Sequence, residues 1–188
     1  MSVKVFLGLL GLVALLRVAE LRISRRNQRA MAAQGVGKIR EVYFPWMVLV
    51  HAGVLGGAAL EVVLLRRPFL PLLAGVMSLL FLLANVLRWW VVRTLKVHWN
   101  VQVMDSARLG VVTAGPYRYI RHPNYVAVFT ELLALPLIHT AWITALAGSA
   151  ANAAVLTQRL ATEERMLLSN PEYRTAMAHK PRFLPGLF

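Results

Sequence analysis

Long apolar stretches alternate with shorter polar connections along the whole chain, which has 188 residues. A helix that crosses a membrane needs about 20 mostly apolar residues, with about 17 as the lower limit. Four of the five stretches meet that limit as they stand, and the fourth along the chain meets it only if it begins earlier, near Asn124. We therefore expect an all-α integral membrane protein with five transmembrane helices. The stretches are 3–21, 43–65, 69–92, 126–138 and 141–160.

The last two apolar stretches are separated by a short uncharged turn around 136–140. We expect them to form a C-terminal helical hairpin, followed by a short cytoplasmic segment. In that segment Asn170 precedes Pro171, an N-cap followed by proline at the first helical position, which predicts a short helix to about His179. We treat 1–188 as one domain, with a three-helix part (1–95) and a part that holds a polar loop, the hairpin and the C-terminal segment (96–188).

Charge sets the expected orientation. The formal net charge is +13, and basic residues concentrate in three connections, 22–40, 93–121 and 165–182. The opposite side of the predicted membrane carries only Lys4, Arg66 and Arg67. Because positive residues favour the cytoplasmic side, the N-terminus is expected outside and the C-terminus in the cytoplasm, in the inner membrane if the source is bacterial. No small-residue cleavage site follows the first stretch, so we interpret it as a retained helix.

The composition also narrows the partners. Hydrophobic residues make up 58% of the chain, and its mean hydropathy is +0.58. The basic residues lie between apolar stretches and form no separate soluble module, which favours anionic lipid headgroups over nucleic acid as their partner. The sequence has no cysteine, so disulfides and thiolate metal sites are excluded, and we expect no metal. Nothing in the sequence determines the oligomeric state.

The densest group of polar and aromatic residues spans 115–125 and reads Gly-Pro-Tyr-Arg-Tyr-Ile-Arg-His-Pro-Asn-Tyr. It lies at the cytoplasmic end of the fourth predicted helix. Arginine offers a planar fork for a carboxylate or phosphate, and tyrosine offers a stacking face with a hydroxyl. Such a cluster fits a binding site, and it equally fits an interfacial anchor of the kind many membrane proteins have.

A second polar cluster, 158–165, lies where the fifth predicted helix leaves the membrane. Arg159 and Glu163 are four residues apart and can pair on one face of a helix, so a solvated helix end is the simpler interpretation. Glu163 and the adjacent Glu164 point about 100° apart, and only one of them can share a face with Arg159. Both clusters cap the same predicted hairpin, however, so they should meet at one membrane surface.

Polar residues inside the apolar stretches form a third group. An ionisable side chain at bilayer depth is costly and is usually functional or paired. Glu131, in the middle of the fourth stretch, is the strongest candidate, either as a functional residue or as a paired structural one. Arg17 and Glu20, three residues apart, fit a local pair.

These motifs resemble the isoprenylcysteine carboxyl methyltransferase family. The resemblance rests on the 115–125 cluster, the hydrophobic hairpin, the later Glu163-Glu164-Arg165 and then Tyr173-Arg174, and it covers about 88–175. Within the family, Arg88-Trp89-Trp90, His98-Trp99-Asn100 and Glu131 resemble a bacterial branch of O-methyltransferases encoded beside type III polyketide synthases. Two positions depart from the pattern: Ala127 replaces a glycine, and Lys96 replaces the glycine expected after Thr94-Leu95.

The resemblance implies S-adenosylmethionine as cofactor, in a pocket closed by the loop and the C-terminal segment. Cofactor-binding roles then fall on Tyr117, Arg121, His122, Pro123 and Tyr125. Catalytic roles fall on Glu163, Glu164 and Arg165. A lipophilic acceptor entering from the membrane would contact Trp89, His98, Trp99, Glu131 and Arg159.

The implied reaction is O-methylation of an alkylpyrone or alkylresorcinol lipid, with carboxyl methylation of a prenylcysteine-like substrate as the alternative. Two other classes remain open. Membrane sterol reductases have a similar His-Pro hairpin and bind a nicotinamide cofactor, but they are usually longer and have more helices. A small accessory protein that grips lipid headgroups would not be an enzyme.

Overall fold

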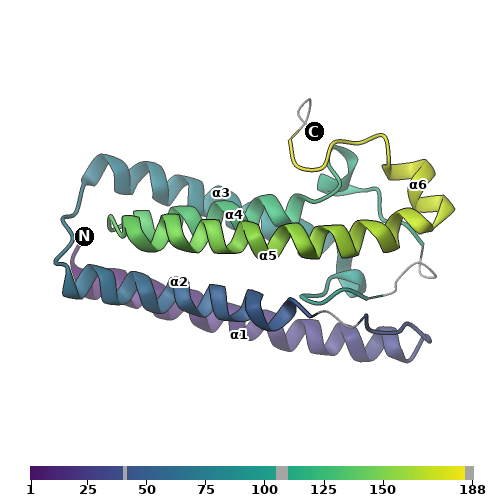
Figure 1. Ribbon diagram of the computed structural model, residues 1–188, viewed down its shortest axis with the longest axis horizontal. Coiled ribbons are helices and arrows are strands. Elements are labelled where there is room, and N and C mark those ends of the chain that lie inside the picture. The colour runs from purple at the N-terminus through teal and green to yellow at the C-terminus, as the bar shows by residue number, and fades with distance from the viewer. Residues whose placement is uncertain (40–41, 105–109, 185–188) are drawn as a thin grey trace.

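The computed structural model describes residues 1–39, 42–104 and 110–184, and within these ranges the regular structure is helical, apart from isolated bridge residues such as the pair Lys38 and Met104. The expected all-α class is therefore confirmed. Most of the helices run along the long axis of an elongated molecule (Figure 1). The helices are α1 (Val3–Ala32), α2 (Phe44–Leu64), α3 (Pro71–Leu95), η1 (Lys96–His98), η3 (Gly115–Arg118), α4 (Pro123–Leu137), α5 (Trp142–Ser169) and α6 (Pro171–Met177).

The apolar stretches form helices, but two helices continue well past their apolar part. α1 runs on to Ala32 through a basic segment, and α5 runs on to Ser169 through the second polar cluster. α4 begins at Pro123, so it does start earlier than its apolar stretch, as expected. The side chain of Asn170 accepts hydrogen bonds from the backbone of Glu172 and Tyr173, which confirms the predicted N-cap of α6.

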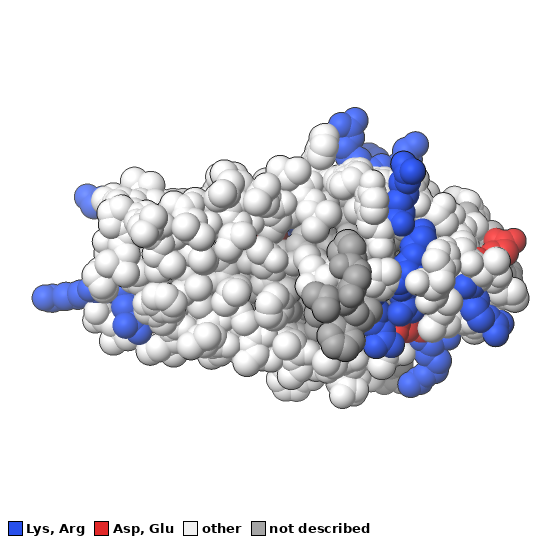
Figure 2. Space-filling model, turned by 90° about the horizontal axis from the view of Figure 1, so that it is seen from above, with Lys and Arg blue, Asp and Glu red and all other residues white. Residues whose placement is uncertain are grey.

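Two segments of the described chain have the length and hydropathy to cross a membrane, α2 (Phe44–Leu64) and Pro71–His98, which contains α3. The topology of five spans remains a prediction. Figure 2 shows a surface without charged residues between a basic end that carries most of the visible lysines and arginines and an opposite end with few. This distribution suits a protein that lies across a bilayer.

The turn after α3 positions the site, and it depends on unusual backbone geometry. Lys96 has a φ of 52°, in the left-handed region that favours glycine, and this is the position where the family resemblance leads one to expect glycine. Asn27 of α1 holds the turn by donating from Nδ2 to the carbonyls of Lys96 (3.1 Å) and Trp99 (2.7 Å). Gly115 begins η3, and a Cβ there would lie 2.3 Å from the Thr94 hydroxyl, so η3 can pack against α3 only with glycine.

α4 and α5 pack against each other, and α5 also packs against α2 (Figure 1). At the far end of the molecule Glu61 of α2 caps the first turn of α5, accepting from the backbone of Ile143 (3.1 Å) and Thr144 (2.7 Å). Arg67 pairs with the same carboxylate at 2.7 Å. These contacts fix the register of α5 against α2, and so fix which α5 side chains reach the site at the other end.

Candidate functional site

A cavity of about 150 Å³ lies at the basic end of the molecule, between the loop after α3 and the ends of α4 and α5. Its walls combine aromatic and ionisable side chains from both polar clusters. Those that matter below are His98, Trp99, Tyr117, Arg121, His122, Asn124, Tyr125, Arg159, Glu163 and Tyr173.

His122 lies at the start of α4 with a non-helical backbone, as expected for a residue before proline. Its ring stacks on the Tyr125 ring, with centroids 5.4 Å apart and an interplanar angle of 18°. Its backbone N–H donates to the Arg182 carbonyl at 3.0 Å, and the Arg121 N–H donates to the Pro181 carbonyl at 3.0 Å. The C-terminal segment is therefore bound directly to the loop that lines the cavity.

Glu164 ties these parts together. Its carboxylate lies 2.9 Å from Arg121 Nη1, 2.7 Å from Arg182 Nη2 and 3.1 Å from His122 Nε2. The hydrogen bonds from His122 and Arg182, together with the charge of Arg121, lower the pKa of Glu164 to about 2, although burial acts in the opposite direction. The side chain is buried and does not line the cavity. Its place in this cluster indicates that it holds the C-terminal segment.

Glu163 has a different neighbourhood from Glu164, because adjacent residues on a helix point about 100° apart. It lines the cavity and accepts a hydrogen bond from the Tyr125 hydroxyl. The same hydroxyl accepts from Arg159 Nε at 3.0 Å. Deeper in the cavity, burial raises the pKa of the Tyr117 and Tyr173 hydroxyls, and the charge of Glu163 adds to the effect. Both tyrosines are therefore neutral at physiological pH.

A second cavity, of about 280 Å³, lies deeper among the helices and is mostly apolar. Its lining comes from α1, α2, α3, α4 and α5 and includes Val18, Leu21, Val48, Leu55 and Val128. Five residues line both cavities: Trp99, Asn100, Asn124, Tyr125 and Arg159. The two cavities therefore share one wall, and Trp99 Nε1 and Asn124 Oδ1 in that wall are buried without a hydrogen-bond partner among the described residues.

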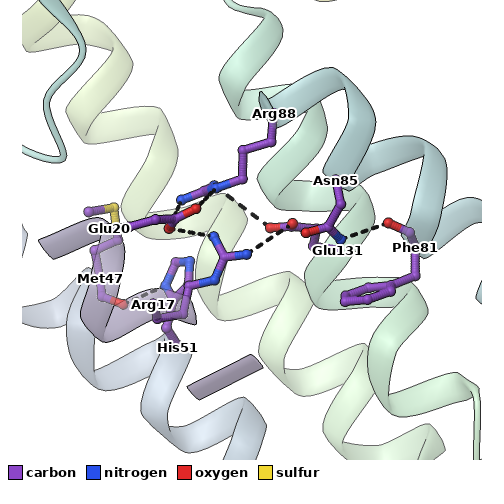
Figure 3. Close-up of polar contacts among 8 residues, drawn as sticks. All are labelled: Arg17, Glu20, Met47, His51, Phe81, Asn85, Arg88 and Glu131. Carbon is purple, nitrogen blue, oxygen red and sulfur yellow. Dashed lines mark hydrogen bonds and ion pairs between the residues drawn. The ribbon is translucent and has the colours of Figure 1, made fainter. Parts of the chain in front are cut away.

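Four charged residues from three helices form a cluster (Figure 3), and three of them, Arg17, Glu20 and Arg88, line the second cavity. Arg88 of α3 donates two hydrogen bonds of 2.7 Å to Glu20 of α1. Arg17 lies 2.7 Å from Glu20 and 3.2 Å from Glu131 of α4, and Arg88 Nη1 lies 3.7 Å from Glu131. Two arginines thus balance two glutamates. Arg17 and Glu20 do form the local pair expected from the sequence, but that pair belongs to a larger network.

The structure brings most of the predicted site residues together. Of the proposed cofactor residues, Tyr117, Arg121, His122 and Tyr125 line the first cavity. Pro123 is fully buried at the first position of α4, where it shapes the helix start. Of the proposed acceptor residues, Trp99 and Arg159 lie in the shared wall.

The other predicted residues lie elsewhere. His98 lines the first cavity rather than the apolar one. Glu131 borders a small neighbouring cavity and pairs with Arg17 and Arg88. Trp89 is 58% exposed on the outside of α3, beneath the guanidinium of Arg93 at 4.6 Å. Arg165 is exposed and lines neither cavity.

Sequence reasoning gave little weight to several residues that line the apolar cavity, among them Glu20, His51, Arg88 and Asn152. Each is a polar residue within an apolar helix, and that alone is a signal of function or pairing. Asn100 and Asn124, in the shared wall, lie in polar segments where an asparagine is common. The sequence therefore gave no reason to single them out from the histidines and tyrosines beside them.

Known proteins resemble this chain in sequence and in fold. The sequence profile of the isoprenylcysteine carboxyl methyltransferase (ICMT) family matches residues 76–169. The uncharacterized protein YpbQ of Bacillus subtilis (strain 168) is 27% identical over 159 residues, which is 85% of this chain and 94% of that protein. The structure of the eukaryotic intramembrane Ras methyltransferase ICMT aligns with a TM-score of 0.57 and 23% identity, over 73% of this chain. This chain spans half the length of that protein, so that likeness concerns the fold.

Proposed function

The chain belongs to the isoprenylcysteine carboxyl methyltransferase family of membrane methyltransferases, and we propose that it transfers a methyl group from S-adenosylmethionine to an oxygen of a lipophilic acceptor. The first cavity holds the cofactor in this proposal, and the apolar cavity holds the acceptor. The observation that carries the proposal is the wall that the two cavities share at Trp99, Asn124, Tyr125 and Arg159.

The residues of the first cavity fit the cofactor. S-adenosylmethionine has a carboxylate and an ammonium group, a sulfonium cation and an adenine. Arg121 is mostly buried, and its Nε has no hydrogen-bond partner among the described residues, so it has a donor left for a carboxylate. The free Oδ1 of Asn124 suits an ammonium group. The faces of Tyr117 and Tyr173 suit the adenine or the sulfonium by stacking or cation–π attraction.

The bound cofactor supplies an electrophilic methyl group, and the protein contributes position, exclusion of water and control of a proton. Methyl transfer is an in-line displacement, so correct placement of the acceptor oxygen supplies most of the catalysis. Arg159 reaches the shared wall and orients that oxygen. A carboxylate acceptor needs no base, whereas a phenol or enol must lose its proton. The Tyr125 hydroxyl links the shared wall to Glu163, which takes up that proton.

For the acceptor, we propose an alkylpyrone or alkylresorcinol lipid, methylated on a ring hydroxyl. Support comes from the resemblance of Trp89, His98 and Glu131 to the polyketide-associated branch, and from Glu163 next to the shared wall. The apolar cavity gives the chain of such a lipid a place to bind, at roughly 0.8 kcal/mol for each buried methylene. A prenylcysteine-like carboxylate is the second candidate, because the family is named for carboxyl methylation of isoprenylcysteine.

Cofactor binding tests the proposal. Purified protein in detergent should be stabilised against thermal unfolding by S-adenosylhomocysteine and not by nicotinamide dinucleotides. Stabilisation by a dinucleotide instead would assign the chain to a reductase. Stabilisation by neither would leave a lipid-binding protein without an enzymatic role.

Substitutions then separate binding from catalysis. His122→Ala should abolish the stabilisation by S-adenosylhomocysteine while the protein still inserts in the membrane. Glu163→Gln should lower turnover more than cofactor affinity, because the amide keeps the hydrogen bond but cannot take up a proton. Glu172→Gln is the matched control, since Glu172 is exposed on α6. Methylation by Glu163→Gln at the parental rate would show that Glu163 is not the base.

A further inference from the structure

The apolar cavity contains a buried amide whose nitrogen has no hydrogen-bond partner within the part of the chain that the structure describes. Asn152 of α5 is 2% exposed, and its Nδ2 has no hydrogen-bond partner among the described residues. It lines the cavity together with Val128 and Leu156. A buried donor without a partner destabilises the folded protein. A ligand that supplies an oxygen at this position removes that penalty, whereas a pure hydrocarbon chain does not.

The position of Asn152 places this oxygen within the ligand. Asn152 precedes Arg159 by seven residues, two helical turns on the same face of α5, or roughly 10 Å along the axis. Helical side chains lean toward the N-terminus, so the longer arginine reaches toward Asn152 and shortens the gap. If the reacting oxygen of the acceptor lies at Arg159, a second oxygen on the same compact head group can therefore reach Asn152.

The surrounding charges limit what that second group can be. Arg17 and Arg88 are balanced by Glu20 and Glu131, so this cluster leaves no net charge to pair with an additional ionised group. Arg88 also lines the cavity, and its Nη1 makes no hydrogen bond to any described residue. The cavity that Asn152 lines thus offers donors beside a charge-balanced cluster, which suits a neutral oxygen better than a carboxylate or phosphate.

We propose that Asn152 is a specificity-determining residue, which binds a second, neutral oxygen on the head group of the lipid acceptor. The acceptor class is then an amphiphile with a long hydrocarbon tail and a head group carrying two oxygens, one methylated at the shared wall and one bound by the amide. This inference rests on the proposed function, because it takes the apolar cavity as the acceptor site.

Two lipids with the same tail test it, pentadecylresorcinol with two ring hydroxyls and pentadecylphenol with one. Their dissociation constants are measured by titration calorimetry on the detergent-solubilised protein, with and without S-adenosylhomocysteine. The wild type should bind the diphenol about fivefold more tightly, the effect of one neutral hydrogen bond. In Asn152→Leu the two lipids should bind equally, and Asn152→Ala should give the same result without a branched side chain.

Stability separates ligand recognition from a structural role. Because the amide nitrogen finds no hydrogen-bond partner among the residues that the structure describes, Asn152→Leu should unfold at the same temperature as the wild type or higher. A structural asparagine would give a lower melting temperature. Ser149→Ala is the matched control: the Ser149 Oγ on α5 is also buried with no hydrogen-bond partner in the described ranges, but Ser149 does not line the cavity. It should keep the fivefold preference.

The outcomes distinguish this inference from the proposed function. A protein that binds S-adenosylhomocysteine but prefers neither lipid, or binds neither, would overturn the role of Asn152 and leave the methyltransferase proposal intact. A fivefold preference that persists in both Asn152 variants would also overturn it. Failure to bind S-adenosylhomocysteine would instead count against the proposed function, whatever the lipid titrations show.

Discussion

Glu164→Gln removes the charge at the centre of the ion-pair cluster and keeps the shape of the side chain. The carboxylate now meets Arg121 at 2.9 Å, Arg182 at 2.7 Å and His122 at 3.1 Å. The amide can accept through one oxygen only, and its NH₂ group faces arginine donors. The substitution should therefore loosen the C-terminal segment, which the cluster binds to the loop before α4.

The magnitude follows from the burial of each contact. A hydrogen bond to a charged group contributes about 1.5–3 kcal/mol, and this applies to the buried contacts with Arg121 and His122. The side chain of Arg182 is 48% exposed, so its contact is worth less, about 0.5–1 kcal/mol. Since glutamine keeps one acceptor, we expect a net loss of about 2–3 kcal/mol. For a chain of this size that lowers Tm by about 5–10 °C.

Two measurements check this prediction. Thermal unfolding in detergent gives the shift in Tm, and limited trypsin digestion reports on the segment itself. The bond after Arg182 is a trypsin site, and the docked segment should protect it in the wild type. Glu164→Gln should be cleaved there faster, as seen by intact mass. Glu163→Gln is the control, because Glu163 lies outside the cluster. If Glu164→Gln matched the wild type in both measurements, the cluster would not anchor the segment.

Three further predictions concern stability. The pKa of Glu164 is lowered from 4.5 to about 2, so the ionised side chain stabilises the folded protein fully above about pH 4.5, and this stabilisation is lost as the pH falls toward 2. In denaturant titrations between pH 6 and pH 3, the free energy of unfolding should therefore fall less in Glu164→Gln than in the wild type. Lys96→Gly should raise the free energy of unfolding by roughly 0.5–1 kcal/mol because it relieves the left-handed backbone, whereas Arg93→Gly in α3 should lower it by about 1 kcal/mol in the same assay. Glu131→Gln should lower the free energy of unfolding by about 3 kcal/mol, and Glu20→Gln should lower it by more, since Glu20 makes three contacts of 2.7 Å. Equal melting temperatures of the two variants would refute this ranking.

The apolar stretches of the sequence predicted the position of each long helix, but only over its apolar part. The ends of α1 and α5 escaped this reasoning, because hydropathy marks only the part of a helix that meets lipid or core. Beyond Leu21 and Leu160 the chain continues with good helix formers such as alanine, arginine and glutamate, and nothing there stops the helix. Asn170 and Pro171 start a helix through contacts with their immediate neighbours in the sequence, so the beginning of α6 was predicted correctly.

The site was partly predictable for a similar reason. Residue types identified the clusters around His122 and Glu163, and Tyr125 joins them in space because α4 and α5 pack side by side. The separate environments of Glu163 and Glu164 follow from helix geometry, but their partners do not. Arg182 and the backbone of the C-terminal segment reach Glu164 through tertiary packing. The same holds for Arg88 and Glu20, which are 68 residues apart with no periodic relation.

The cluster of Arg17, Glu20, Arg88 and Glu131 also has a consequence for how the protein is made. The ribosome completes Arg17 and Glu20 first, then Arg88, and Glu131 only after a further 43 residues. Throughout that interval the half-built cluster holds two positive charges against one negative charge. Glu20 can pair with Arg88 as soon as α3 is made, but the cluster becomes neutral only once α4 has delivered Glu131.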